Sequence, residues 1–231
     1  MTSPLYFVES VAGLAGQLAS RVAALPLARA PQWTLVIAGG SVARRLLPPF
    51  ARLPLPWSTC HVLFADERAV PADDTDSNWR LCRAAAVDAP MMQATWHRLE
   101  ADAPDLEPAA ADYARIIHAL LGVDGQLDVA LLGVGDDGHI ASAFPGRQLP
   151  DATVFPVLDA PKPPPRRLSL SPRLLADARL VCLAAFGAGK APALRDALST
   201  TSTTPAGALL RQAREPLVLL DAGAASLVAI R

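Results

Sequence analysis

Cysteine and lysine are both scarce in this sequence, and each scarcity narrows the classes of protein it can belong to. The 231 residues contain three cysteines, Cys60, Cys82 and Cys182, an odd number with no paired spacing. This pattern predicts reduced thiols in the core of a cytoplasmic protein and disfavours a disulfide framework or a zinc site. Of the 21 basic residues, 19 are arginine, so the two lysines, Lys162 and Lys190, are worth locating.

The sequence also lacks a strong charge imbalance and a long hydrophobic run. Its 21 basic and 22 acidic residues give a formal net charge of −1, and no basic cluster offers a surface for nucleic acid or an anionic membrane. The longest apolar stretches, such as residues 180–187, are much shorter than the ~20 residues that span a bilayer. Because Glu9 interrupts the apolar N-terminus and no basic residue precedes Arg21, we expect no signal peptide.

Apolar residues, by contrast, are plentiful at 52% of the chain, which is enough to bury a substantial core. Continuous apolar runs without period-2 alternation predict strands that are covered on both faces. Five such runs occur, namely Thr34–Ala38, Cys60–Ala65, Leu127–Gly133, Leu180–Phe186 and Leu217–Asp221. Helix-like stretches lie around them at Ser10–Leu25, Ser41–Leu53, Ser77–Val87, Leu106–Leu121, Lys190–Leu198 and Pro205–Arg214. This alternation predicts a largely parallel α/β sheet with helices on both sides.

Two proline-rich segments, Pro48–Pro56 and Ala160–Pro165, are predicted to be turns or extended linkers. Ligands of an open parallel sheet bind at the carboxyl ends of its strands, so the residues after each apolar run are the informative ones. Polar or glycine-rich sequence follows four of the runs: Gly39-Gly40-Ser41, Asp66-Glu67-Arg68, Gly133 to His139, and Gly187-Ala188-Gly189-Lys190. We therefore expect a functional site at the carboxyl ends of these strands.

The first two of these segments suit anion binding. At Gly39-Gly40-Ser41 the glycines let the backbone approach a ligand, and Ser41 can cap the following helix and donate a hydrogen bond. This segment is neither a phosphate-binding P-loop nor a dinucleotide fingerprint. In the second segment, Arg68 can hold a phosphate or carboxylate with two hydrogen bonds, and Asp66 can orient a neighbour or act as a base.

The last two segments supply a base and a cation. Three glycines around His139 predict a tight turn that aims the imidazole into the crevice, where it can accept a proton at neutral pH. Lys190 opens a helix, a poor place for a cation unless it binds an anion. Lys162 has no comparable context, so we expect it to be a background surface residue. No histidine or cysteine spacing predicts a metal site, and no nucleophile elbow is present.

These segments resemble a known family. The stretches LVIAGGSVARRLL, FADERAVPADDTDSNWRL, LDVALLGVGDDGHIASAFPG and PPPRRLSLSPRLLADARLVCLAAFGAGKAPALRDAL, in this order, are similar to 6-phosphogluconolactonases. The resemblance implies one doubly wound α/β/α domain over residues 1–231 that needs no cofactor or metal. It also implies a phosphosugar lactone as substrate, hydrolysed to 6-phosphogluconate in the pentose phosphate pathway. We expect a monomer.

By this resemblance His139 is the general base that activates water, Arg68 is a ligand or charge stabiliser, and Asp66 orients groups. The resemblance places Gly39, Gly40, Ser41, Arg167 and Lys190 around the substrate, chiefly at its phosphate. The division of Arg68 and Arg167 between phosphate and carbonyl stays open. The chain departs from the family pattern at Val42, Ile140 and Ala188.

Two alternative functions remain. Glucosamine-6-phosphate deaminases continue the corresponding D-G-H-I-A motif with Phe-Asn-Glu-Pro, whereas Phe144 stands here in place of that glutamate. A non-catalytic module that binds sugar phosphates would carry a DNA-binding segment, for which the roughly 33 residues before the first predicted strand are too few and not basic. Lactone hydrolysis is the favoured interpretation.

Overall fold

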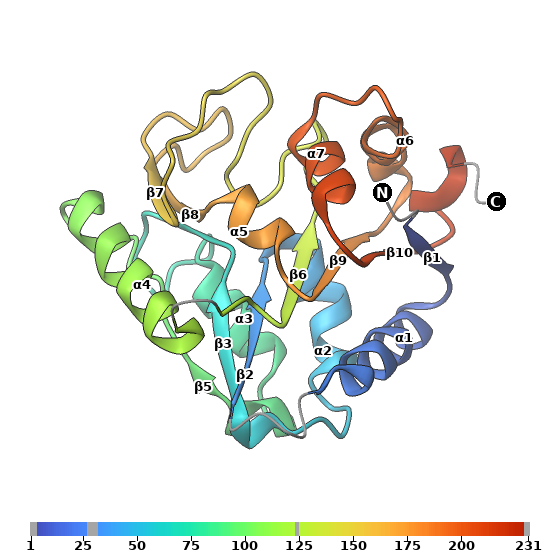
Figure 1. Ribbon diagram of the computed structural model, residues 1–231, viewed down its shortest axis with the longest axis horizontal. Coiled ribbons are helices and arrows are strands. Elements are labelled where there is room, and N and C mark those ends of the chain that lie inside the picture. The colour runs from blue at the N-terminus through green and yellow to red at the C-terminus, as the bar shows by residue number, and fades with distance from the viewer. Residues whose placement is uncertain (1–3, 27–31, 123–124, 229–231) are drawn as a thin grey trace.

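The computed structural model describes residues 4–26, 32–122 and 125–228. Within them, seven parallel strands form the main sheet, whose spatial order differs from the chain order (Figure 1). From one edge to the other these are β1 (Leu5–Val8), β10 (Pro216–Leu220), β9 (Leu180–Ala185), β6 (Val129–Gly133), β2 (Trp33–Ile37), β3 (Cys60–Phe64) and β5 (Thr95–Trp96). All five predicted strands are confirmed, to within two residues at each end.

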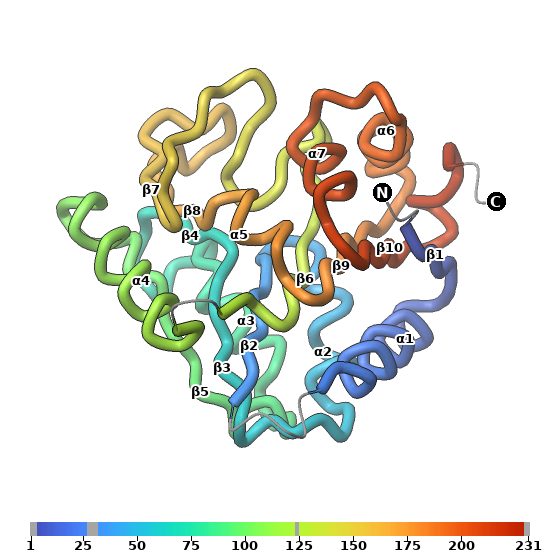
Figure 2. The backbone as a smooth tube through the Cα atoms, in the orientation of Figure 1, coloured from blue at the N-terminus to red at the C-terminus, as the bar shows by residue number. Residues whose placement is uncertain are grey.

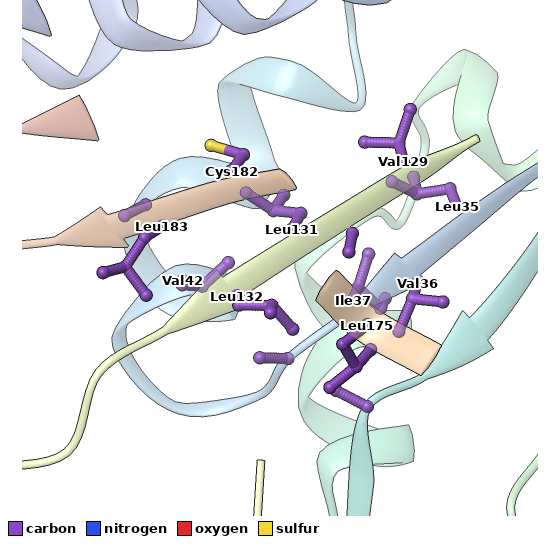
Figure 3. Close-up of a cluster of buried hydrophobic side chains, with 14 of the residues drawn as sticks. Leu35, Val36, Ile37, Val42, Val129, Leu131, Leu132, Leu175, Cys182 and Leu183 are labelled. Atoms are coloured by element: carbon purple, nitrogen blue, oxygen red, sulfur yellow. The ribbon is translucent and has the colours of Figure 1, made fainter. Parts of the chain in front are cut away.

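The core lies against both faces of the central strands. Every side chain of β2, β9 and β10 is buried, which requires a covering layer on each side of the sheet. Figure 3 shows this packing, with Val42 from the helical turn after β2 and Leu175 from helix α5 near the side chains of β2 and β6. The predicted fold class, a doubly wound α/β sheet with helices on both faces, is therefore confirmed.

The helices begin at side chains that satisfy their first free N–H groups. Ser10, Ser77, Asp105, Ser171 and Thr204 each accept a backbone hydrogen bond at the start of a helix. The helices are α1 (Val11–Ala24), α2 (Leu47–Phe50), α3 (Asn78–Ala85), α4 (Leu106–Leu121), α5 (Pro172–Ala176), α6 (Ala191–Ala197) and α7 (Pro205–Gln212). Shorter turns are η2 (Val42–Leu46), η3 (Trp57–Thr59), η4 (Pro90–Gln93), η5 (Ala188–Lys190) and η6 (Ala224–Leu227). Over the described ranges, no helix has both the length and the hydropathy that crossing a membrane demands.

The helix predicted over Ser41–Leu53 differs from the observed structure. The chain first makes one π-helical turn, η2, and only then the short helix α2, in which Pro48 and Pro49 occupy the first turn. Proline is tolerated there because the first N–H groups of a helix have no partner inside it. The proline-rich segment that starts at Pro48 is thus partly helical.

A second, smaller sheet was not predicted. It consists of three antiparallel strands in the order β4 (Asp66–Arg68), β8 (Arg167–Leu170) and β7 (Val154–Val157), and Figure 2 shows it beside the end of β3 and helix α4. The segment Ala160–Pro165 connects β7 to β8 without helix or strand, in agreement with its prediction as a turn or extended linker. The pairing of β4 with β8 places Arg68 opposite Arg167 across the ladder.

The strand order defines where a ligand site belongs. From β2 the chain moves outward through β3 to β5, and it then returns to β6 on the other side of β2 before moving outward through β9 and β10. The order therefore reverses between β2 and β6, and such a reversal leaves a crevice at the carboxyl ends of the two strands. Gly39 and Gly40 follow β2 at this crevice, and the segment that carries His139 follows β6.

Candidate active site

A cavity of about 270 Å³ lies at this crevice. It is lined by residues from the ends of β2 and β6, the start of the small sheet and the turn after β9. The structure brings together all the residues singled out from the sequence, because the cavity is lined by Gly39, Gly40, Ser41, Asp66, Arg68, His139, Arg167 and Lys190. It also brings in two polar residues to which the sequence assigned no role, Asn78 and Lys162.

The Gly39-Gly40-Ser41 segment forms the floor of the cavity beside Asn78. A Cβ atom on Gly39 would lie 1.8 Å from Asn78 Oδ1, so only glycine leaves room for this amide. Ser41 does not cap the following helix, contrary to the sequence-based expectation, since its own backbone is already helical and no side-chain cap bond is formed. The hydroxyl of Ser41 thus lines the cavity instead of closing the helix end.

Asp66 is a buried carboxylate held by neutral donors. Ser142 Oγ donates to its Oδ2 at 2.7 Å, and Asn78 Nδ2 donates to its Oδ1 at 3.1 Å. Arg167 Nη1 lies 3.9 Å from Oδ2, near enough to compensate the charge but too far for a hydrogen bond. Ser142 belongs to the same sequence segment as His139, so this carboxylate ties the small sheet to the turn that carries the imidazole.

The neighbouring carboxylate, Glu67, has a structural task. It accepts backbone N–H bonds from Arg68, Asn78 and Trp79, each at 2.7 Å, and a hydroxyl bond from Ser77 at 3.1 Å. Burial raises the pKa of Glu67, and these backbone hydrogen bonds oppose the increase. Glu67 thereby anchors the start of α3 against β4 and holds Asn78 at the cavity.

His139 lies in the turn after β6, and its side chain is 17% exposed. Its Nδ1 lies 2.5 Å from Asp137 Oδ1, so we assign the Nδ1 proton to this bond and leave Nε2 as the proton acceptor. Burial alone would raise the pKa of Asp137, but the hydrogen bond and charge of His139 hold it below its usual value. A Cβ atom on Gly135 would lie 2.0 Å from His139 Nδ1, so this glycine makes room for the ring.

Phe144 contacts both the imidazole of His139 and the guanidinium of Arg167. Its ring centroid lies 4.7 Å from that of His139, and Arg167 Cζ lies 5.6 Å from the same ring on a cation–π contact. Phe144 is only 3% exposed, so it fixes the spacing of both groups by packing. The contacts of Phe144 with His139 and Arg167 could not be predicted from the sequence, in which Phe144 is notable only because it replaces a glutamate.

The two lysines meet at one carboxylate. Lys190 Nζ lies 2.6 Å from Asp136 Oδ1, and Lys162 Nζ lies 3.4 Å from Asp136 Oδ2. The hydrogen bond from Lys190 is the largest of the effects that lower the pKa of Asp136. We expected Lys162 to be a background surface residue. This expectation is wrong, because Lys162 lines the cavity together with Lys190.

Across the described parts of the chain, no group of three or more His, Cys, Asp or Glu side chains is arranged to hold a metal ion. The chemistry that the cavity offers is that of its own side chains. It provides a histidine paired with a carboxylate, an amide, a serine hydroxyl and four cationic groups in a space the size of a small polar ligand.

Fold and cavity together define a parallel α/β protein with a histidine–carboxylate pair and a pocket lined by four cationic side chains at its topological switch point. The chain belongs to the family of glucosamine-6-phosphate isomerases/6-phosphogluconolactonase, whose model matches residues 8–219.

Similar proteins include 6-phosphogluconolactonases from several kingdoms. A probable chloroplastic 6-phosphogluconolactonase of Oryza sativa is 36% identical over 189 residues, which cover 74% of this chain and 58% of the rice protein, less than two thirds of its length. The 6-phosphogluconolactonase of Homo sapiens is 32% identical over 235 residues, covering 96% of this chain and 91% of the human protein. The crystal structure of a 6-phosphogluconolactonase from Shewanella baltica superposes with a TM-score of 0.80 at 27% identity, covering 96% of this chain and 98% of that one.

Proposed function

We propose that the protein hydrolyses 6-phospho-D-glucono-1,5-lactone to 6-phosphogluconate, a step of the pentose phosphate pathway. One observation carries the proposal: His139, which is hydrogen-bonded to Asp137, lines the same cavity as the cationic side chains of Arg68 and Lys190. Hydrolysis of a phosphorylated lactone requires a general base close to cationic side chains that can bind the phosphate. Family membership and the 6-phosphogluconolactonase relatives support the same reaction.

In the proposed mechanism, His139 Nε2 takes a proton from water as the water oxygen attacks the lactone carbonyl. Asp137 holds the ring in the tautomer that leaves Nε2 unprotonated, and it stabilises the imidazolium that forms. The ring C–O bond then breaks, and the proton passes from His139 to the alkoxide oxygen that leaves. One water is consumed, and the product carries a new carboxyl and a new hydroxyl group.

The remaining cavity residues bind and orient the substrate in this proposal. Lys190, Gly39, Gly40 and Ser41 receive the phosphate, while Arg68 stabilises the negative charge that develops on the carbonyl oxygen. Arg68 is well placed for this, because Nη1 donates to Asp76 O at 2.6 Å and so fixes the guanidinium plane. Phosphate binding supplies energy remote from the reacting bond and places the carbonyl near His139.

The proposal favours hydrolysis over deamination because of Phe144. Deamination of an amino sugar phosphate needs a carboxylate near the histidine for ring opening, by the resemblance described above. Here the corresponding side chain is a buried phenyl ring that packs on His139 and has no ionisable proton to transfer. A module that only binds sugar phosphates would have no use for the close contact between Asp137 and His139.

The test is turnover by the purified protein. The lactone is generated in situ, its spontaneous opening is measured without protein, and 6-phosphogluconate formation is followed with a coupled dehydrogenase. His139→Ala should lower kcat by ~10²–10⁴-fold, the usual contribution of a general base, while binding of 6-phosphogluconate persists. His118→Ala is the matched control, since His118 contacts Thr153 outside the cavity.

Two results would overturn the proposal. Ammonia release from glucosamine 6-phosphate without faster lactone opening would establish the deaminase. Binding of 6-phosphogluconate without any turnover above background would establish a binding module.

We further propose a cytoplasmic protein that works as one domain over residues 1–231. Support comes from Cys60, Cys82 and Cys182, which are all buried free thiols whose pKa burial raises. Such thiols stay protonated and unreactive in a reducing compartment. Cell fractionation with an antibody to the native chain tests the compartment, and a single cooperative unfolding transition tests the domain count.

A further inference from the structure

We propose that Lys162 is a second cation for the phosphate group of the substrate, next to Lys190, and that Asp136 holds both lysines while no phosphate is bound. The identity of the ligand rests on the proposed function. The site itself is formed by three separate segments of the chain, which carry Asp136, Lys162 and Lys190.

The first observation is the arrangement of charges. Asp136 uses one carboxylate oxygen for Lys190 Nζ and the other for Lys162 Nζ, at 2.6 and 3.4 Å. The two ammonium groups are thus spaced to share one anion that presents two oxygens. A phosphate group also presents paired oxygens and carries about −1.5 to −2 charges at neutral pH, more than the carboxylate. Asp136 therefore occupies the position that a phosphate would take with greater electrostatic gain.

The second observation is how Lys162 comes to lie at the cavity. Arg167 Nη2 donates to the carbonyl of Lys162 at 2.8 Å, and Arg167 Nε donates to that of Pro164 at 3.0 Å. A weaker bond from Nη2 to Pro163 O at 3.4 Å completes the set. One guanidinium therefore holds the backbone of residues 162–164, of which Lys162 and Pro163 line the cavity.

The hydrogen bonds that Arg167 donates through Nε and Nη2 all go to this segment. Arg167 is 4% exposed, its plane lies over Phe144, and Nη1 faces Asp66 at 3.9 Å. Burial lowers the pKa of Arg167, and the charge of Asp66 opposes that decrease. A buried guanidinium is costly unless its donors are used, and here they are used mainly on the loop that carries Lys162. Arg167 is accordingly a positioning residue for Lys162 in this proposal.

Lys162 retains the freedom that a ligand-binding group needs. Its side chain is 45% exposed, against 23% for Lys190. The backbone is fixed by Arg167 while the four-carbon side chain remains adjustable, so the ammonium group can follow an incoming anion. Asp136, with a side chain 64% exposed, can withdraw into solvent when the anion arrives.

The test measures the affinity for inorganic phosphate by titration calorimetry and KM for the lactone. Lys162→Met should raise the dissociation constant for phosphate and KM for the lactone about 10-fold each, the effect of losing one charge-assisted hydrogen bond, with kcat and Tm unchanged. Lys162→Arg should restore most of the affinity. Arg166→Met is the matched control, since it removes one positive charge from the same connection between β7 and β8, at a side chain that lies outside the cavity and contacts Pro104 O.

The displaced carboxylate and the positioning residue have tests of their own. Asp136→Asn should tighten phosphate binding severalfold, and this gain should shrink in the Lys162→Met background because the two groups interact. Arg167→Lys should weaken phosphate binding in the wild-type background but add little to Lys162→Met. A general loss of stability would instead lower the affinity equally in both backgrounds.

Unchanged phosphate affinity in Lys162→Met, or weaker phosphate binding in Asp136→Asn, overturns the proposal. The phosphate titration does not depend on turnover. If wild-type protein binds phosphate through Lys162 and yet hydrolyses no lactone, the second cation stands and the proposed function fails. If lactone hydrolysis is present and insensitive to Lys162→Met, the reverse holds.

Discussion

The contact between Asp137 and His139 makes a quantitative prediction about the Asp137→Asn variant. The substitution keeps the size of the side chain but removes its charge. Its amide can also turn an N–H toward Nδ1, which favours the tautomer with the proton on Nε2 and leaves no base facing the substrate. A charge-assisted hydrogen bond contributes about 1.5–3 kcal/mol, which corresponds to roughly 10- to 100-fold in rate. Asp137 is 37% exposed, so solvent screening puts the expected loss in the lower part of that range.

The loss should appear in kcat and leave KM for the lactone nearly unchanged, because Asp137 touches the base and not the substrate-binding cations. The assay is the coupled formation of 6-phosphogluconate at saturating lactone, corrected for spontaneous opening. Asp151→Asn is the control, because it makes the same change at an exposed carboxylate that only approaches Arg173. A kcat within a factor of two of wild type in Asp137→Asn, measured on protein that retains its Tm, would refute the assigned role of this pair.

Three further changes test other parts of the structure. Lys190→Arg should raise KM for the lactone with little effect on kcat, since a planar guanidinium replaces a compact ammonium; an unchanged KM would remove Lys190 from the binding groups. Gly39→Ala should lower Tm and activity together, because the new methyl group would lie 1.8 Å from the Asn78 amide; crystals of the variant would show the displaced side chain. Burial lowers the pKa of His61 and His97, the latter also through the charge of His61, so the unfolded chain binds more protons than the folded one as the pH falls below neutrality. Stability should therefore fall on acidification in denaturant titrations, and less steeply in His97→Gln.

The central strands could be predicted because burial on both faces leaves a local signal. Strands such as β2 and β9 are continuous apolar runs, so their existence needs no knowledge of the rest of the chain. The small sheet has no such signal: β4 consists of Asp66, Glu67 and Arg68, and β7 contains a proline. Strand pairing between segments about a hundred residues apart supplies what the local sequence does not. The edge strand β1 was missed for a related reason, since its pattern is half exposed.

The candidate site was predictable for the residues that directly follow a buried strand. His139 follows β6, and Lys190 follows β9. Their positions could be predicted because ligands of an open parallel sheet bind at the carboxyl ends of its strands. Lys162 was missed because its place depends on Arg167, whose hydrogen bonds to loop carbonyls leave no pattern in the sequence. Ser41 looked like a helix cap by residue type alone, but the π-helical turn after it changes the geometry on which capping depends.

The order in which the cavity residues occur along the chain has a consequence for synthesis on the ribosome. Gly39 to Arg68 and the His139–Asp137 pair emerge first, whereas Lys162 and Lys190 are added later. A chain interrupted before residue 162 therefore carries the proposed base and lacks both lysines of the proposed phosphate site. Under the proposed function, the base and the phosphate site are completed at different times, and only a chain that extends past β9 holds both.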